Sequence, residues 1–266
     1  MIQFNLCRFG KLVKWMLQGD KRYLIKSFLQ VLVVMLLIFI FFTILINTTG
    51  DDPHGYKSSG IAAFAMVVVN LVLGPALMFY SMEGKHDMQA LMLLPASNFE
   101  KYLVRHLNWI LTLILATLAF FAADVLQYLI HLVLGHDYVR FVGSVIVNDM
   151  IGPIASSRYA SEAFRPRFIA SMTVLVIWFQ SLYAIGATLI RTRKFSWVFT
   201  TVFIILLGFL VYKIQGYVEA IQLNDHSSAG DYAIGFGFYL VWAMINYCLS
   251  YRFFCRTQVI SKFVNF

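Results

Sequence analysis

The sequence predicts an all-α integral membrane protein with six transmembrane helices and an amphipathic N-terminal helix. The 266 residues are 60% hydrophobic and only 13% charged, with a mean hydropathy of +0.75, whereas soluble domains are about half apolar and a quarter charged. Apolar stretches of about 20 residues recur, each long enough to cross a hydrocarbon core of roughly 30 Å as a helix. These stretches are continuous, which excludes the alternating pattern of a transmembrane barrel.

The first predicted element is an amphipathic helix over residues 1–24. Apolar side chains recur there at spacings of three and four among basic ones, a pattern typical of a helix that lies in the membrane interface. Gly19-Asp20 predicts the turn by which the chain leaves this helix. The apolar positions are Phe4, Leu6, Phe9, Leu12, Val13, Trp15, Met16 and Leu17.

Six apolar stretches follow, and we expect each to span the membrane. Polar residues 48–60 predict an outer turn, Gly74-Pro75 predicts a kink, and RTRK at 191–194 predicts a tight inner turn. Residues 135–167 form the largest outer segment, and their apolar patches predict surface or re-entrant helices. The predicted spans cover about 25–47, 61–82, 104–134, 168–190, 195–214 and 232–250.

The distribution of basic residues predicts the orientation of these spans. With the N-terminus inside and six spans, fifteen of the 21 Lys and Arg residues fall on the cytoplasmic side. This positive-inside bias places both termini in the cytoplasm and explains the net charge of +8 without a nucleic-acid partner.

The sequence lacks the motifs of several enzyme classes. Gly10-Lys11 is followed by Leu12 and Gly84-Lys85 by His86, so neither forms a phosphate-cradling loop, and the chain is expected to bind no ATP itself. G-x-S-x-G and H-E-x-x-H are also missing. The cysteines lack metal-ligand spacing, so we expect free thiols and no metal or cofactor in this chain. They are Cys7, Cys248 and Cys255.

Residues 83–103 form a polar cytoplasmic connector between the second and third spans. Pro95 disfavours helical geometry at the residue before it, so a short amphipathic helix is predicted to end near Leu94. Ser97 and Glu100 have the S-x-x-E spacing of a capping box, which predicts the start of the next helix. That helix can run from Asn98 to about Leu134. It is longer than the membrane core, so its first turns are predicted to project into the cytoplasm.

Asp124 is the one acidic residue well inside a predicted span. Gln127, Tyr128 and His131 follow it on the same helical face. Buried ionisable residues in membranes are candidates for function because their burial is costly. Two interpretations stay open for Asp124, Gln127 and His131. One is a substrate path or proton relay, and the other is a hydrogen-bonded contact between helices or an extension of the side chains towards the outer surface.

LLPASNFEKYLVR at 93–105 resembles the connector after the second span of bacterial type-2 ABC transporter permeases. The layout of the chain is similar too, with an interfacial "elbow" helix, six spans and both termini inside. The resemblance implies an export permease of the cytoplasmic membrane, which pairs with a second permease subunit and docks a separate ATP-binding subunit that holds ATP and Mg²⁺. The implied contact and geometry residues are Met88, Leu91, Met92, Leu94, Pro95, Ser97 and Glu100.

Two alternatives accompany this resemblance. Glu100 can act in capping alone, without touching a partner. The chain can also be an envelope protein independent of any ATPase, either a scaffold or an enzyme on lipid-linked substrates. Arg158, Arg165 and Arg167 of the outer segment would then bind anionic groups. The outer segment also departs from better-known permeases, which place theirs between the fifth and sixth spans, so their substrate path is not carried over.

Overall fold

The computed structural model describes residues 4–49, 52–82, 85–134, 139–152, 164–190, 195–219 and 229–256. All elements in these ranges are helices. Four are long and apolar enough to cross a membrane, and Ser196–Leu210 is apolar over a shorter length. The chain is therefore an all-α, membrane-embedded protein. The four helices are Lys21–Thr48, His54–Leu77, Asn98–Val133 and Ile169–Leu189.

Helices α1 (Leu6–Gly19) and α2 (Lys21–Thr49) are separated by a bend at Asp20. The predicted exit turn therefore lies where Gly19-Asp20 places it. Asn5 caps α1, because its side-chain oxygen accepts the backbone N–H groups of Cys7 at 2.9 Å and Arg8 at 3.3 Å.

Helix α3 (Asp52–Leu73) begins within the polar stretch for which the sequence predicts an outer turn. Pro53 is compatible with this start, because the first turn of a helix needs no N–H from that position. At Gly74 the α-helix changes to a 3₁₀-helix, η1 (Gly74–Leu77), where Gly74-Pro75 predicts a kink. Pro75 lacks the N–H that would continue the α-helical hydrogen bonds.

The remaining helices lie over the predicted connector, the outer segment and the other predicted spans. Of the outer segment, residues 142–152 are helical, which agrees with the prediction of helices there, while the predicted turn at 191–194 lies outside the described residues. The helices are α4 (Lys85–Leu93), α5 (Asn98–Val133), α6 (Val142–Val145), the π-helix η2 (Ile146–Ile151), α8 (Phe164–Leu189), α9 (Ser196–Glu219) and α10 (Ala229–Arg256).

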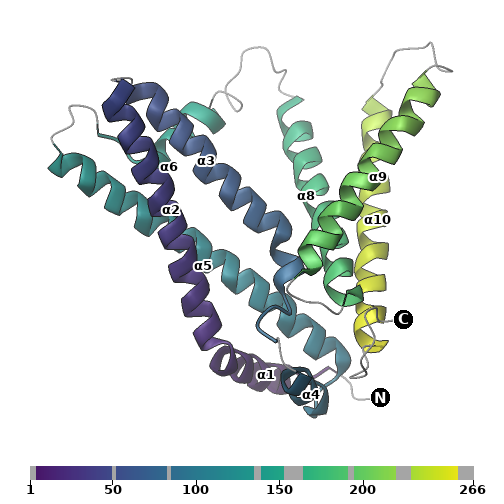
Figure 1. The fold of residues 1–266 in the computed structure, drawn as a ribbon. Coiled ribbons are helices and arrows are strands. Elements are labelled where there is room, and N and C mark those ends of the chain that lie inside the picture. The colour runs from purple at the N-terminus through teal and green to yellow at the C-terminus, as the bar shows by residue number, and fades with distance from the viewer. Residues whose placement is uncertain are drawn as a thin grey trace. The chain divides into compact units, whose positions relative to one another are not determined.

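The chain divides into two compact units. The first, called here the α2–α3 unit, comprises Lys14–Leu71 and Leu107–Ile169. Its apolar core joins α2, α3, the second half of α5, α6 and η2 (Figure 1). Within the core, the rings of Phe39 and Phe120 lie 6.4 Å apart in an edge-on arrangement. The buried core residues are Met35, Phe39, Ile46, Tyr56, Ala63, Phe120, Ala123, Val142, Val145 and Ile146.

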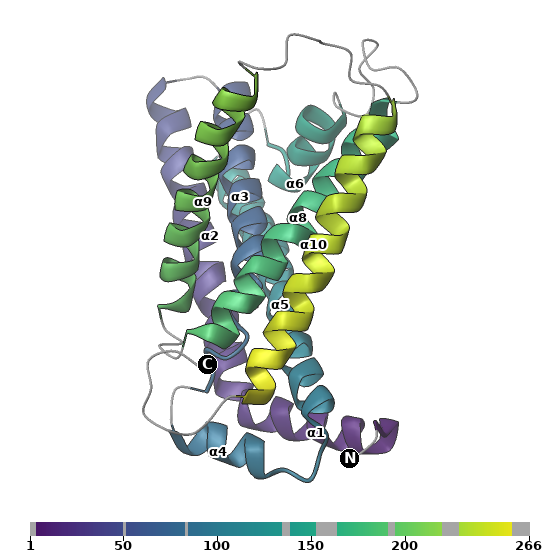
Figure 2. The ribbon, with the colours of Figure 1, turned by 90° about the vertical axis from the view of Figure 1, so that its right-hand side faces the viewer.

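The second, the α8–α10 unit, comprises Met1–Val13, Val72–His106 and Ala170–Phe266. Helices α8 and α10 lie side by side, whereas α4 lies crosswise to them (Figure 2). The Trp178 ring packs edge-on against Trp242 at 5.5 Å, and Asn246 donates a hydrogen bond to Ser181 Oγ at 2.9 Å. The lone amide at Asn246 therefore joins two helices, as is common in membrane bundles.

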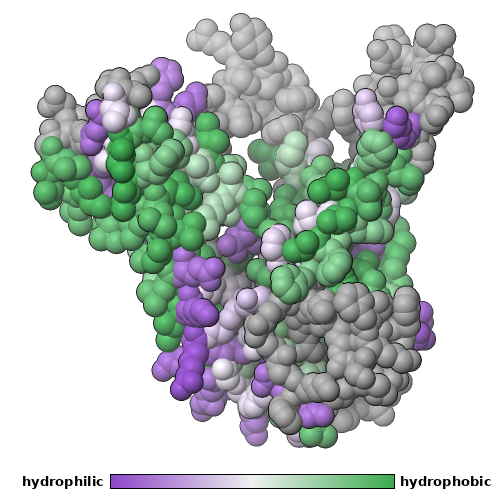
Figure 3. Space-filling view, in the orientation of Figure 1, coloured by the Kyte–Doolittle hydropathy of each residue, from purple (hydrophilic) through white to green (hydrophobic). Residues whose placement is uncertain are grey.

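Helix α2 shows how the surface of the α2–α3 unit suits a membrane. Large apolar side chains lie exposed along one side of it, at positions such as Ile25, Leu29, Val33, Leu37 and Phe41. The surface is hydrophilic at the end that joins α1, hydrophobic along the middle, and hydrophilic in places again at the opposite end (Figure 3). Such a surface is stable when lipid covers it, because water cannot solvate it favourably.

Candidate functional site

The joint between α4 and α5 has the geometry that the sequence predicts. Helix α4 ends at Leu93, two residues before Pro95. Helix α5 begins at Asn98, and both hydrogen bonds of the capping box are present. The Ser97 N–H donates to Glu100 Oε2 at 2.8 Å, and the Glu100 N–H donates to Ser97 Oγ at 3.2 Å. Each side chain thus satisfies a backbone donor at the start of α5.

Glu100 also holds the beginning of α1. Its carboxylate accepts the Asn5 N–H at 2.7 Å and two hydrogen bonds from the Arg8 guanidinium, from Nε at 2.8 Å and from Nη2 at 2.7 Å. A planar guanidinium matches a carboxylate in this two-point geometry, which fixes orientation as well as proximity. Glu100 is fully buried, so one carboxylate joins the N-terminal ends of two helices.

These contacts keep the carboxylate ionised. The hydrogen bond from Arg8 is the largest cause that lowers the pKa of Glu100, from its ordinary 4.5 to about 2, and the Asn5 and Ser97 N–H groups lower it further against the effect of burial. The same pair raises the pKa of Arg8. Glu100 lies in the first turn of α5, before residue 104 where the predicted span begins.

The next residue, Lys101, fixes the other side of the joint. Its ammonium group donates a hydrogen bond of 2.7 Å to the carbonyl of Met92, in the last turn of α4. Carbonyls in the last turn of a helix lack helical partners and attract cations. Lys101 is 4% exposed, and this burial lowers its pKa. Lys101 therefore ties the end of α4 to the first turn of α5.

Tyr102 attaches the same turn of α5 to the last turns of α10. Its hydroxyl donates to Ser250 Oγ at 3.0 Å, and Ser250 donates in turn to the Ala184 carbonyl of α8 at 2.9 Å. The Tyr102 ring lies 5.5 Å from the ring of Tyr251 and 5.6 Å from that of Phe254. Consecutive residues of α5 therefore contact α1, α4 and α10, which makes this turn a rigid junction of the α8–α10 unit.

Exposure separates the predicted contact residues into two groups. Met88 and Leu91 are 5% and 0% exposed, so they pack inside the chain and present no surface to a partner. Met92 and Leu94 are partly exposed, and Pro95 is exposed. Leu93, which the sequence analysis did not select, is 83% exposed. The sequence alone does not show whether an apolar helical face packs against the rest of the chain or is exposed to a partner.

Asp124 makes the contacts that the helix-contact interpretation describes. Its two carboxylate oxygens accept the backbone N–H groups of Val142 and Gly143, each at 2.8 Å, at the start of α6. Asp124 is 3% exposed, so α5 holds α6 through a buried cap. Beside it, the rings of Tyr128 and Phe141 stack at 4.3 Å.

His131 joins α5 to α2 and α3. Its Nε2 lies 2.7 Å from Thr43 Oγ1 and its Nδ1 lies 2.8 Å from the Tyr56 hydroxyl. Thr43 donates its own proton to the Phe39 carbonyl, which assigns the His131 proton to Nε2 and makes Nδ1 the acceptor. Gln127 is buried as well, and its Oε1 has no hydrogen-bond partner among the described residues. A substrate path through Gln127 stays a hypothesis.

The cysteines of this chain, Cys7, Cys248 and Cys255, are free and exposed. No group of three or more His, Cys, Asp or Glu that could hold a metal ion occurs in the described part of the chain. The side chains of Arg158, Arg165 and Arg167 lie outside the described residues. Comparisons of the chain with family models, with curated proteins and with solved structures return no match.

Proposed function

We propose that the chain is the permease subunit of an ATP-driven transporter, an exporter of the bacterial cytoplasmic membrane. A separate ATP-binding subunit supplies the energy, and a second permease subunit completes the transport path. The observation that carries the proposal is the joint between α4 and α5. It presents a short crosswise helix and connects that helix, through Lys101 and the capping box, to a helix long enough to cross the membrane.

The chemistry of the joint suits the transmission of force. A short helix that a partner moves can shift a membrane helix only where the connection resists bending. At 36 residues, α5 is about 54 Å long and exceeds the hydrocarbon core of roughly 30 Å. Its first turns therefore lie beyond the core, where a soluble subunit can reach the adjoining helix α4. Movement of α4 then passes into α5 through the hydrogen bond between Lys101 and the Met92 carbonyl.

The docking surface in this proposal is the exposed side of α4 and its end, centred on Leu93. Met92, Leu94 and Pro95 border it, whereas Met88 and Leu91 support α4 from inside. In this proposal Glu100 holds the joint in shape and does not contact the ATP-binding subunit, because its carboxylate already accepts hydrogen bonds from Ser97, Asn5 and Arg8.

The test is co-purification of a tagged full-length chain from its native membrane, with ATP hydrolysis assayed on the same sample. We expect a soluble ATP-binding subunit to accompany the wild type. Leu93→Asp places a charge on the docking surface and is expected to lower the recovered partner at least tenfold. Leu6→Asp is the matched control, because Leu6 is 77% exposed but lies on α1.

Two outcomes contradict the proposal. The first is a wild-type chain that emerges alone without ATP hydrolysis, which favours the ATPase-independent envelope protein. The second is a partner that Leu93→Asp retains as fully as the wild type does, since docking then occurs elsewhere. Replacement of both Leu91 and Met92 by Asp would be a poor test, because Leu91 is fully buried and an Asp at this position would disturb folding.

A further inference from the structure

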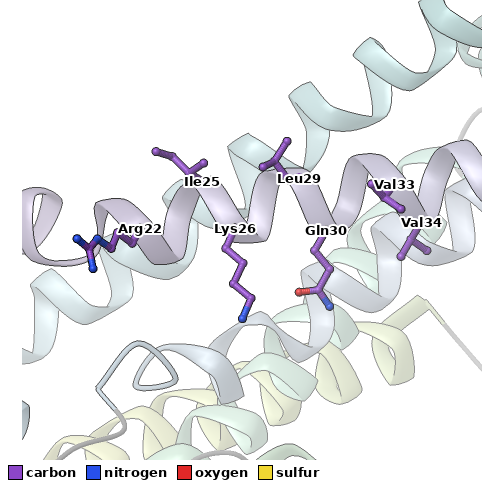
Figure 4. A pocket seen from close by; sticks show the side chains of 7 residues that line it. All are labelled: Arg22, Ile25, Lys26, Leu29, Gln30, Val33 and Val34. Atoms are coloured by element: carbon purple, nitrogen blue, oxygen red, sulfur yellow. The ribbon is translucent and has the colours of Figure 1, made fainter.

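A strip of polar and apolar side chains lies on one face of α2, near its junction with α1. Arg22, Lys26 and Gln30 follow one another at intervals of four residues, and Ile25, Leu29 and Val33 form a parallel row (Figure 4). Together with Val34 these residues line an open pocket of about 590 Å³. Small-molecule sites have volumes of roughly 300–1,000 Å³, so the pocket has room for a substantial part of a ligand.

The two cations of this strip have no partner among the residues that the structure describes. Arg22 and Lys26 are exposed, and neither has a hydrogen bond or ion pair with another described residue. The pocket has no acidic side chain among its lining residues. In Figure 4 the two charged ends point in different directions, so one anion meets both when these exposed side chains turn towards it, and no acidic lining residue competes.

The position of the strip along α2 determines where such an anion would lie. Helix α2 has 29 residues, which gives a length of about 43 Å and matches a bilayer of roughly 40–45 Å with its headgroup layers. Arg22 and Lys26 lie in the first two turns, which fall in a headgroup layer. Leu29, Val33 and Val34 follow within the next two turns, at the level of the acyl chains.

We propose that this strip binds an anionic phospholipid from the leaflet in which it lies. The headgroup phosphate contacts Arg22 and Lys26, and Gln30 adds a hydrogen-bond donor. An acyl chain covers Leu29 and Val33. A soluble phosphate would satisfy the two cations but leave the apolar row exposed, so the combined chemistry favours a lipid. This proposal stands whether or not the chain is a transporter permease.

The test is native mass spectrometry of the full-length chain in detergent, titrated with phosphatidylglycerol, with phosphatidylcholine and with glycerol 3-phosphate. We expect tight binding of phosphatidylglycerol, weaker binding of the zwitterionic lipid and no binding of the chainless headgroup. A direct hydrogen bond from a cation to the phosphate contributes roughly tenfold, so Arg22→Gln with Lys26→Gln should weaken binding of phosphatidylglycerol roughly 100-fold.

Lys11→Gln with Lys14→Gln is the matched control. It removes the same charge from two exposed residues of the adjoining α1, and we expect a loss of less than about threefold, because these residues lie outside the pocket. Both double variants should keep the helical circular dichroism of the wild type. If either lost it, the lipid selectivity of the wild type would decide the question.

Several results would overturn the proposal. Equal affinity of the wild type for the two lipids would exclude an anion site, as would equal losses in the two double variants. Binding of glycerol 3-phosphate as tight as that of the lipid would identify a soluble phosphate as the ligand. A dimer that separates in the Arg22 and Lys26 variant, with unchanged lipid binding, would make the strip an interface between two copies.

Discussion

Among the described residues, Glu100 joins parts of the chain that lie far apart in the sequence. Its carboxylate accepts hydrogen bonds from three other residues although only the spacing to Ser97 is visible in the sequence. Removal of such a side chain leaves buried donors without acceptors, which costs more than the hydrogen bonds themselves contribute.

Glu100→Ala should therefore lower the free energy of unfolding by about 2–3 kcal/mol. Glu100→Gln should have a smaller effect, because Gln also completes a capping box. Thermal unfolding of the purified protein measures both. Asp149→Asn is the control, since Asp149 is exposed on η2, and it should leave the unfolding temperature unchanged. Equal stability of Glu100→Ala and the wild type would show that the network is dispensable.

The pKa of Glu100 predicts a dependence of this contribution on pH. Because folding lowers the pKa from 4.5 to about 2, the stabilisation is complete above pH 4.5 and is lost as pH falls towards 2. The stability difference between the wild type and Glu100→Gln should be equal at pH 7 and pH 5 and smaller at pH 3. A difference that stays constant to pH 3 would show that the carboxylate charge is not its source.

At the scale of helices, close packing of α8 on α9 depends on a glycine. A Cβ atom at Gly186 would overlap the side chain of Thr200, whereas one at Gly208 would meet nothing within 4 Å. Small residues allow this close approach of membrane helices. Thr200 itself is buried and donates a hydrogen bond of 2.7 Å to the Ser196 carbonyl, so it has little freedom to move away.

Gly186→Ala should accordingly destabilise the protein by about 1–3 kcal/mol through overpacking. Gly208→Ala is the control, because a Cβ atom at this position has free space around it. This variant should be neutral or stabilising, since Ala is about 1 kcal/mol more favourable than Gly inside a helix. Adding Thr200→Ala to Gly186→Ala removes the overlapping hydroxyl and methyl groups but keeps the Cβ of residue 200 at 3.0 Å, so it should restore part of the loss. Unfolding in detergent compares the variants, and equal stability of the two single variants would exclude a tight contact at Gly186.

The helices also show what the sequence can predict. Local signals are sufficient for the bend at Asp20, the end of α4 before Pro95 and the capping box, because each depends on residues within one or two turns. The sequence predicts an outer turn over 48–60, whereas α3 begins at Asp52, because Asp, Pro and Gly occur both in turns and in the first turns of helices. The partners Arg8 and Glu100 lie 92 positions apart, and no local pattern links them.

A similar limit applies to the candidate site. Met88 and Leu91 share the apolar face of α4 that the sequence predicts, but whether a face packs inside the chain or faces a partner depends on the tertiary fold. The apolar surroundings of Asp124 in the sequence indicate that this residue has a role. They do not identify the group that its carboxylate contacts. That partner is the backbone of α6, and backbone donors carry no sequence signature.

For the whole molecule, orientation in the membrane can be tested with the native cysteines. The positive-inside bias predicts that Cys7 and Cys255 lie on the cytoplasmic side, and both are exposed. In single-cysteine variants, an impermeant maleimide should label both in inside-out vesicles and neither in sealed right-side-out vesicles. Lys57→Cys in a background without the native cysteines should show the opposite pattern. Labelling of Cys7 and Cys255 from opposite sides would contradict the six-span arrangement.

The junction at the start of α5 has a consequence for the synthesis of the chain. Phe99 contacts Phe4 at one end of the chain, with ring centres 6.2 Å apart, and Tyr251 near the other, at 6.0 Å. The ribosome makes Tyr251 long after Phe99, so the first turn of α5 lacks this aromatic neighbour until α10 is made. A chain that stops before α10 would leave Phe99 without Tyr251 and Tyr102 without Tyr251 and Phe254, so aromatic surface that α10 contacts in the complete fold would lack its partner.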